Sequence, residues 1–189
     1  MHHIDQVADR IRVTFDASTA ARDKALAQAR TLTRHCANAI RAVHRDEHDL
    51  AKQNLDEASQ LAESLKTSLA PYPELYFAGY TQDALKEFSE ANVVYYLVVA
   101  DRLPDPEELG LEHATYLQGV AEAAGEMRRR CLDMLRRGNY PEAEKLLAYM
   151  AVIYAGLITM VSTDAISGGL RSLPDLVRGR IKAGNHVNI

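Results

Sequence analysis

Apolar residues recur every three or four positions along most of the chain, which is the period of an amphipathic α-helix. In the first segment they stand at Ile4, Val7, Ile11 and Phe15, and the period resumes from Ala25 to Val43. Residues typical of turns interrupt the pattern at 69–73, 103–106, 138–141 and 167–169. The chain therefore predicts an all-α fold, with helices over 4–44, 47–68, 73–101, 106–136, 141–163 and 170–183.

The longest predicted helices exceed the average of about 11–12 residues for globular proteins. They indicate an elongated antiparallel helical bundle of about six to seven helices, within a single domain over 1–189. The β-branched segment 93–99 is the best candidate for a strand, but no turn signal precedes it and we interpret it as helical. Long helices also present faces that a partner can cover, so we expect self-association.

One segment, residues 146–163, runs for 18 positions without a charge, which is near the minimum for a membrane span. No second span accompanies it, and we interpret it as a helix buried on all sides by its neighbours, with no membrane as partner. The N-terminus lacks the apolar stretch of a signal peptide, and Cys36 and Cys131 stand far apart. We therefore expect a cytoplasmic protein with reduced thiols.

The net charge of −4 is unevenly distributed. Residues 10–45 contain eight basic and two acidic side chains, a local charge of +6 that leaves −10 for the remainder. On a helical wheel, four arginines of this window fall within about 60° of one another, opposite the apolar face. They are Arg30, Arg34, Arg41 and Arg45, and His44 lies beside them. Guanidinium groups match phosphate geometry, so this stripe predicts nucleic-acid-backbone binding; the alternative is an ordinary solvated face.

Two pairs of glutamates are spaced so that each pair lies on one helix face. Glu87 and Glu90 are three residues apart, and Glu122 and Glu126 are four apart on the next long helix. Adjacent carboxylates repel each other unless a cation lies between them, and their oxygens are ligands that Mg²⁺ or Mn²⁺ prefers. Bulky apolar residues continue the face of the first pair, which favours a partly buried site there. For the second pair, salt bridges to the arginines that follow on the same helix are the simpler interpretation.

Four segments of the chain resemble the translin family, in the family's order. Residues 30–45 (RTLTRHCANAIRAVHR) resemble its first basic helix, and residues 116–128 (YLQGVAEAAGEMR) resemble its central helix, with the pattern YLxGVxxxxGEL/MxR. Residues 85–91 (LKEFSEA) are similar to the LQEYVEA segment of the Trax branch, and residues 170–178 (LRSLPDLVR) to its C-terminal helix. Together they cover the chain nearly end to end, and the short length resembles a prokaryotic Trax-like protein.

The resemblance implies an all-α bundle that assembles into a hollow, often octameric shell and binds RNA or single-stranded DNA. The Trax branch is a Mg²⁺-dependent endoribonuclease, whose metal is held by two glutamates three apart and by an aspartate on a later helix. The two glutamates correspond to Glu87 and Glu90, and the glutamate of the central pattern corresponds to Glu126. The resemblance therefore implies RNA as partner, Mg²⁺ or Mn²⁺ as cofactor, and a homo-oligomer of eight copies.

The catalytic aspartate of that family has no counterpart here. It stands in a VYDG sequence, whereas residues 153–156 read IYAG, so its position is occupied by Ala155. A methyl group cannot ligate a metal, and the chain should bind RNA but cut it poorly or not at all. Two explanations stay open: the natural protein lost activity and kept RNA binding, or the substitution was engineered to trap uncleaved RNA. A third interpretation makes Ala155 an ordinary core residue of an apolar helix.

These observations leave three functions. The first is a Trax-type endoribonuclease that Ala155 renders inactive, and the second is a non-catalytic oligomer that binds single-stranded nucleic acid. The third is a purely structural helical assembly, which gives the arginine stripe no role. Metal-dependent cleavage separates the first two.

Overall fold

The structure is a computed structural model that describes residues 2–161 and 170–185. Within these ranges the chain forms eight α-helices, two short helical turns and no strand, which confirms the predicted all-α fold. The elements are α1 (His2–His44), α2 (His48–Leu69), α3 (Pro73–Tyr76), α4 (Gly79–Tyr95), the π-helix η1 (Tyr96–Ala100), α5 (Pro106–Leu109), α6 (His113–Arg136), α7 (Tyr140–Val161), the 3₁₀ turn η2 (Leu170–Ser172) and α8 (Leu173–Asn185).

Two of the predicted helices are interrupted. The helix expected over 73–101 breaks after α3, where Ala78 is extended, and ends in a π-turn closed by Asp101 at φ 54°. The helix expected over 106–136 breaks at Gly110, whose φ of 60° is favourable for glycine and ends α5. Gly138 also has a positive φ, of 73°, as predicted for a helix end.

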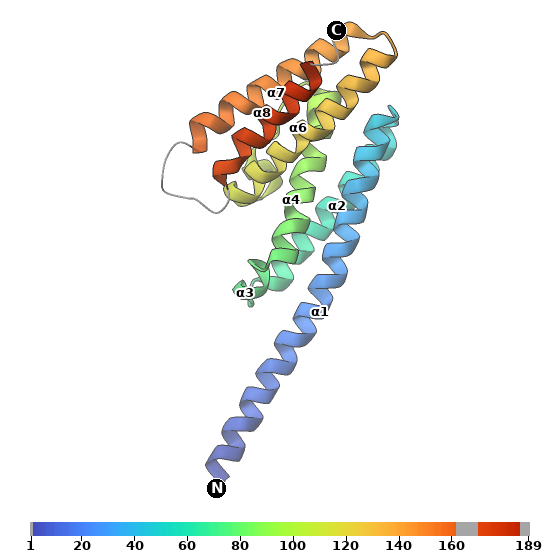
Figure 1. Cartoon of the computed structure of the whole chain (residues 1–189). Helices are drawn as coiled ribbons and strands as arrows, with labels where there is room; N and C mark the ends of the chain where they lie inside the picture. Colours follow the sequence, from blue (N-terminus) through green and yellow to red (C-terminus); the bar gives the residue numbers. More distant parts are fainter. Residues whose placement is uncertain (1, 162–169, 186–189) are drawn as a thin grey trace.

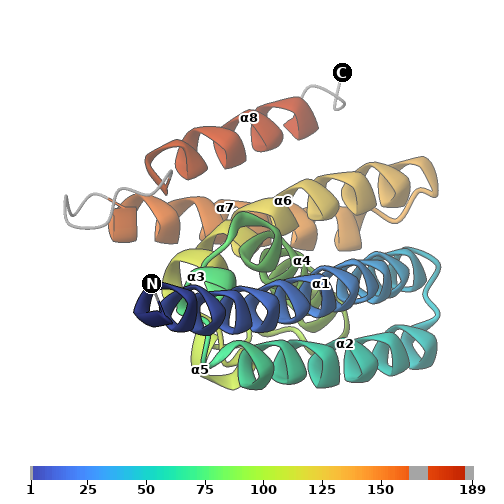
Figure 2. The same cartoon turned by 90° about the horizontal axis from the view of Figure 1, so that it is seen from below.

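The helices are stacked in layers, with α4 in the middle. Helix α4 packs against α1 and α2 on one side and against α6 on the other, while α7 and α8 complete the outer layer on α6. Figure 2 shows this order from α8 through α6, α7 and α4 to α1 and α2. The N-terminal part of α1 extends well beyond the bundle (Figure 1), so the predicted elongated shape is present.

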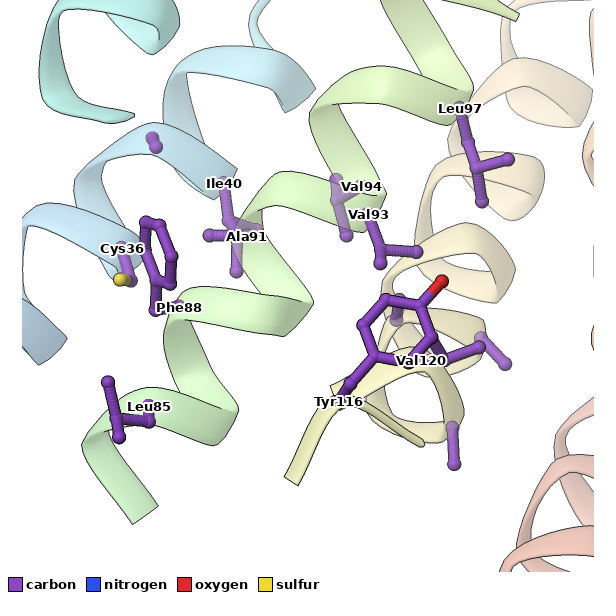
Figure 3. Close-up of a cluster of buried hydrophobic side chains, with 14 of the residues drawn as sticks. Cys36, Ile40, Leu85, Phe88, Ala91, Val93, Val94, Leu97, Tyr116 and Val120 are labelled. Carbon is purple, nitrogen blue, oxygen red and sulfur yellow. The ribbon is translucent and has the colours of Figure 1, made fainter. Parts of the chain in front are cut away.

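The core lies on both sides of α4. Figure 3 shows Cys36 and Ile40 of α1 beside Phe88 and Ala91 of α4, all buried. On the side of α6, the close approach requires Gly119. A Cβ there would lie 2.3 Å from Cβ of Ser89 and 2.8 Å from the carbonyl oxygen of Lys86. The Ser89 hydroxyl donates to the Tyr116 carbonyl at 3.1 Å, which ties the two helices together.

Two apolar faces are exposed in the single chain, and the second of them contradicts the prediction that residues 146–163 are buried on all sides. The first apolar segment is exposed, with Ile4 69% and Phe15 67% accessible, because this part of α1 has no neighbour. Helix α7 buries only the side that meets α6 and α8, and it exposes Val152 and Ile158 on the other.

Helix α7 also raises the question of a membrane span. By length and composition, residues Tyr140–Met160 are the one stretch of the described chain apolar enough to cross a membrane, and 28% of the stretch is buried. One such helix is weak evidence for a span, because core helices of soluble proteins also meet this criterion.

Candidate metal and nucleic-acid site

Four glutamates of α4 and α6 lie near enough to one another for three of them to act electrostatically on the fourth, Glu90. The pKa of Glu90 is raised to about 8 by burial, and further by the negative charges of Glu87, Glu126 and Glu122. Cys36, on the facing side of α1, also has a raised pKa, because its thiol is buried and lies near Glu87 and Glu90. Both glutamate pairs predicted from the sequence therefore belong to one acidic cluster, which we define as Glu87, Glu90, Glu122 and Glu126.

Basic side chains pair with three members of this acidic cluster. Oε2 of Glu126 lies 2.5 Å from Nε2 of His44, and this hydrogen bond lowers the pKa of Glu126. Oε2 of Glu122 accepts from Arg180 at 2.7 Å.

Lys86 Nζ lies 3.6 Å from a Glu87 oxygen. Glu90 makes no hydrogen bond or ion pair with any residue that the structure describes. It is the carboxylate whose charge is compensated least.

His44, which lies beside the arginine stripe in the sequence pattern, points toward the acidic cluster in the structure. Its side chain is 7% exposed and turns toward the carboxylate of Glu126 on α6. The half-buried carboxylate of Glu126 supplies His44 with a partner from another helix, which the solvent-facing arginines of the stripe lack within the described chain. The pairing expected for Glu126 is present as well, because Arg129 lies 3.7 Å away.

The four arginines of the stripe are all exposed, but they differ in their partners. Arg45 pairs with Glu47 at 2.7 Å, and Arg41 donates to the side-chain oxygen of Asn38 at 2.5 Å. Arg30 and Arg34 make no side-chain hydrogen bond or ion pair within the described chain. Their guanidinium groups are therefore available to an external anion.

A groove of about 380 Å³ connects the arginine stripe with the acidic cluster. It runs between α1 and α4, and its lining includes Arg30 from the stripe and Glu87 from the cluster. A chain lying in this groove can contact a free guanidinium and a carboxylate of the cluster at the same time.

The second basic segment, residues 128–137, is mainly structural. The guanidinium of Arg130 is buried and donates to the Val43 carbonyl at 2.8 Å and to Asp46 at 2.6 Å. It thereby fixes the C-terminal end of α1 to α6. No pattern in the sequence predicts this long-range contact, because the partners are more than eighty residues apart.

Ala155 lies on the exposed side of α7, and its carbonyl accepts from the Thr159 hydroxyl at 3.0 Å. The interpretation of Ala155 as a core residue is therefore wrong for the single chain. Its proposed role as the position of a third metal ligand stays a prediction.

The donors of the acidic cluster fit a hard divalent cation. Among the described residues, no three His, Cys, Asp or Glu side chains are close enough together to hold a metal ion in this conformation. Mg²⁺ commonly takes one or two carboxylates and completes its octahedron with water, so a three-residue cage is not required. All the donors are carboxylate oxygens, and burial, followed by the neighbouring carboxylates, raises the pKa of Glu90, so that uptake of a proton or a cation is favoured there.

The fold and the cluster together define a class: an all-α layered bundle with paired glutamates on adjacent helices and a basic first helix. Comparison with known proteins assigns the family. The chain is 32% identical over 160 residues to the uncharacterized protein MJ0175 of Methanocaldococcus jannaschii, covering 84% of this chain and 70% of that protein. No family model matches the chain.

Solved structures share the fold of this chain over nearly its whole length. A complex of AfC3PO with duplex RNA superposes with a TM-score of 0.86 at 30% identity, covering 95% of this chain and 93% of that one. Apo-NeC3PO superposes with a TM-score of 0.87 at 23% identity, covering 95% and 94%. These are C3PO proteins of the translin/Trax type. The chain belongs to the translin/Trax family.

Proposed function

We propose that this protein binds RNA along the arginine stripe of α1 and leads the RNA backbone through the α1–α4 groove to the acidic cluster. The observation that carries the proposal is that Arg30 and Glu87 line the same groove. The similarity to AfC3PO, which was solved with duplex RNA, supports RNA as the ligand. Guanidinium contacts to phosphate position a backbone without reading bases, so we expect weak sequence preference.

The acidic cluster would hold Mg²⁺ or Mn²⁺, with Glu87 and Glu90 as the ligands. Glu126 is held by His44 and Arg129, and it would support the site from outside the coordination sphere. A bound ion of this kind polarises a phosphoryl oxygen and lowers the pKa of its water. The protein's own residues would position the RNA backbone, with Glu87 facing the groove and Glu90 one helical turn further along α4. With Ala155 in place of a third acid, we propose that RNA is bound but not efficiently cut.

We also propose that the protein assembles into a closed homo-oligomer of eight copies. The exposed apolar residues of α1 and α7, such as Phe15 and Val152, offer surface that a single bundle leaves uncovered. Such an assembly would gather the arginine stripes of several copies around one RNA and add their contacts. Light scattering at micromolar concentration tests this, and a stable monomer of 21.0 kDa would contradict it.

The direct test of RNA binding is fluorescence anisotropy with a labelled single-stranded RNA at increasing salt. We expect affinity to fall steeply, because each neutralised phosphate releases counterions. A labelled single-stranded DNA of the same sequence should also bind, since the contacts are to the backbone. Failure to bind either strand at low salt would overturn the proposal.

A further inference from the structure

We propose that Arg180 of α8 is a positioning residue that holds Glu122 away from a divalent cation and so limits the metal site to Glu87 and Glu90. This inference rests on the proposed metal site. It assigns a function to the C-terminal helix, which otherwise contributes only packing to the outer layer.

The contacts of Arg180 are specific and bring α8 directly onto α6. One guanidinium nitrogen, Nη1, donates to the carbonyl oxygens of Ala121 at 2.5 Å and Glu122 at 2.8 Å. The other, Nη2, donates to the carboxylate of Glu122 at 2.7 Å. Three acceptors on one turn of α6 thus fix the position of a single guanidinium.

Gly125 makes this close approach possible. A Cβ at this position would lie 2.9 Å from Cζ of Arg180, inside the distance that real contacts show. The side chain of Arg180 is 21% exposed, so the ion pair is partly shielded from water. Charge-assisted hydrogen bonds in such surroundings are stronger than neutral ones.

The consequence for the acidic cluster follows from charge. Glu122 is near enough to Glu90 to act on it electrostatically. While Arg180 is paired with Glu122, the pair adds no net charge, and the bonded carboxylate oxygen is not free to ligate. If the guanidinium is removed, Glu122 becomes an uncompensated carboxylate beside Glu87 and Glu90. A divalent cation then gains both an added negative charge and a further oxygen ligand.

The test measures Mn²⁺ binding to the full-length protein without RNA, by the electron paramagnetic resonance signal of free Mn²⁺. We expect Arg180→Gln to bind Mn²⁺ about tenfold more tightly than wild type, which corresponds to about 1.4 kcal/mol. The matched control is Arg178→Gln, which removes an arginine of the same helix that pairs at 2.7 Å with Asp175, also on α8. This control should leave Mn²⁺ affinity unchanged.

A second variant keeps the test valid if Arg180→Gln loosens α8. Glu122→Gln combined with Arg180→Gln removes the whole ion pair and leaves the net charge of the cluster region unchanged. We expect its Mn²⁺ affinity to lie within about twofold of wild type. A large loss of affinity in this double variant would show that Glu122 is already a ligand and would overturn the inference.

The remaining outcomes separate the inference from the proposed function. If wild type binds Mn²⁺ and Arg180→Gln binds it equally well, the inference is wrong and the metal site stands. If neither wild type nor Arg180→Gln binds Mn²⁺, both are wrong. If Arg180→Gln binds Mn²⁺ and wild type does not, the inference is supported in its strongest form.

Discussion

The two sides of α1 carry charged and polar residues in contrasting surroundings. On the outer side, Arg30 and Arg34 are exposed and make no ion pair with described residues, and water solvates their charge. On the inner side, His44 and Cys36 face the acidic cluster, where burial makes each uncompensated charge costly. The outer side can bind an anion without losing an internal partner, whereas the inner side is already arranged around carboxylates.

The same contrast applies within the acidic cluster. Glu122 and Glu126 have basic partners, Arg180 and His44, at 2.7 and 2.5 Å, whereas Glu90 has none among the described residues. A carboxylate that is shielded from water and lacks a partner either takes up a proton or binds a cation. The raised pKa of Glu90 is the first of these responses, and metal binding would be the second.

The largest expected effect is on stability and concerns the close packing of α6 against α4 at Gly119. Gly119→Ala would place a Cβ 2.3 Å from Cβ of Ser89, so α4 and α6 would have to separate. We expect a loss of about 3 kcal/mol in the free energy of unfolding, measured by urea denaturation. The control is Gly179→Ala on α8, where nothing lies within 4 Å; it should stabilise the protein by about 0.5–1 kcal/mol. Equal midpoints for the two variants would refute this account of the packing.

A smaller effect, on RNA affinity, is expected from the exposed arginines on the outer side of α1. Arg30→Ala combined with Arg34→Ala should weaken binding of single-stranded RNA about 30-fold, or about 2 kcal/mol, and should flatten the salt dependence. The control combines Arg136→Ala with Arg178→Ala, two exposed arginines that each pair with an aspartate three residues earlier. Equal losses of RNA affinity in both double variants would mean that binding depends on the net charge of the protein and not on the arginine stripe.

The smallest effect concerns the pH dependence of stability without metal. The pKa of Glu90 is raised from an ordinary value of 4.5 to about 8 in the folded chain, so the fold favours the protonated form. Its contribution to stability is complete below pH 4.5 and is lost as the pH rises to about 8. In EDTA, Glu90→Gln should therefore match wild type at pH 4.5 and exceed it by about 1–2 kcal/mol at pH 8. A parallel pH dependence of the two melting temperatures would contradict this.

The helical period predicted the fold class well, because α-helices of this length follow a local pattern. It missed the breaks at Ala78 and Gly110, where the interruption spans only a few residues. The apolar period at Ile4 and Phe15 shows only that a face is suited to burial and not which neighbour covers it, and the structure leaves this face exposed.

The candidate site was predictable only in part. Spacing brought Glu87 and Glu90 onto one face, and in the structure Glu90 is near enough to Glu87 and Glu126 to be affected by their charges. The inward turn of His44 and the contact of Arg180 with Glu122 depend on residues more than fifty positions apart, which a pattern within one helix does not register. The resemblance to translin pointed to Ala155, which the structure places on the exposed side of α7.

The most direct test of the central claim is cleavage of single-stranded RNA by Ala155→Asp in the presence of Mn²⁺. Ala155 is exposed in the single chain, so the aspartate need not be buried there without a partner. We expect wild type and the uncharged control Ala155→Asn to bind the RNA intact, and Ala155→Asp to cut it until EDTA is added. Adding Glu87→Ala to Ala155→Asp should abolish cleavage. A folded Ala155→Asp protein that binds RNA and Mn²⁺ but leaves the RNA uncut would contradict the site described for this chain.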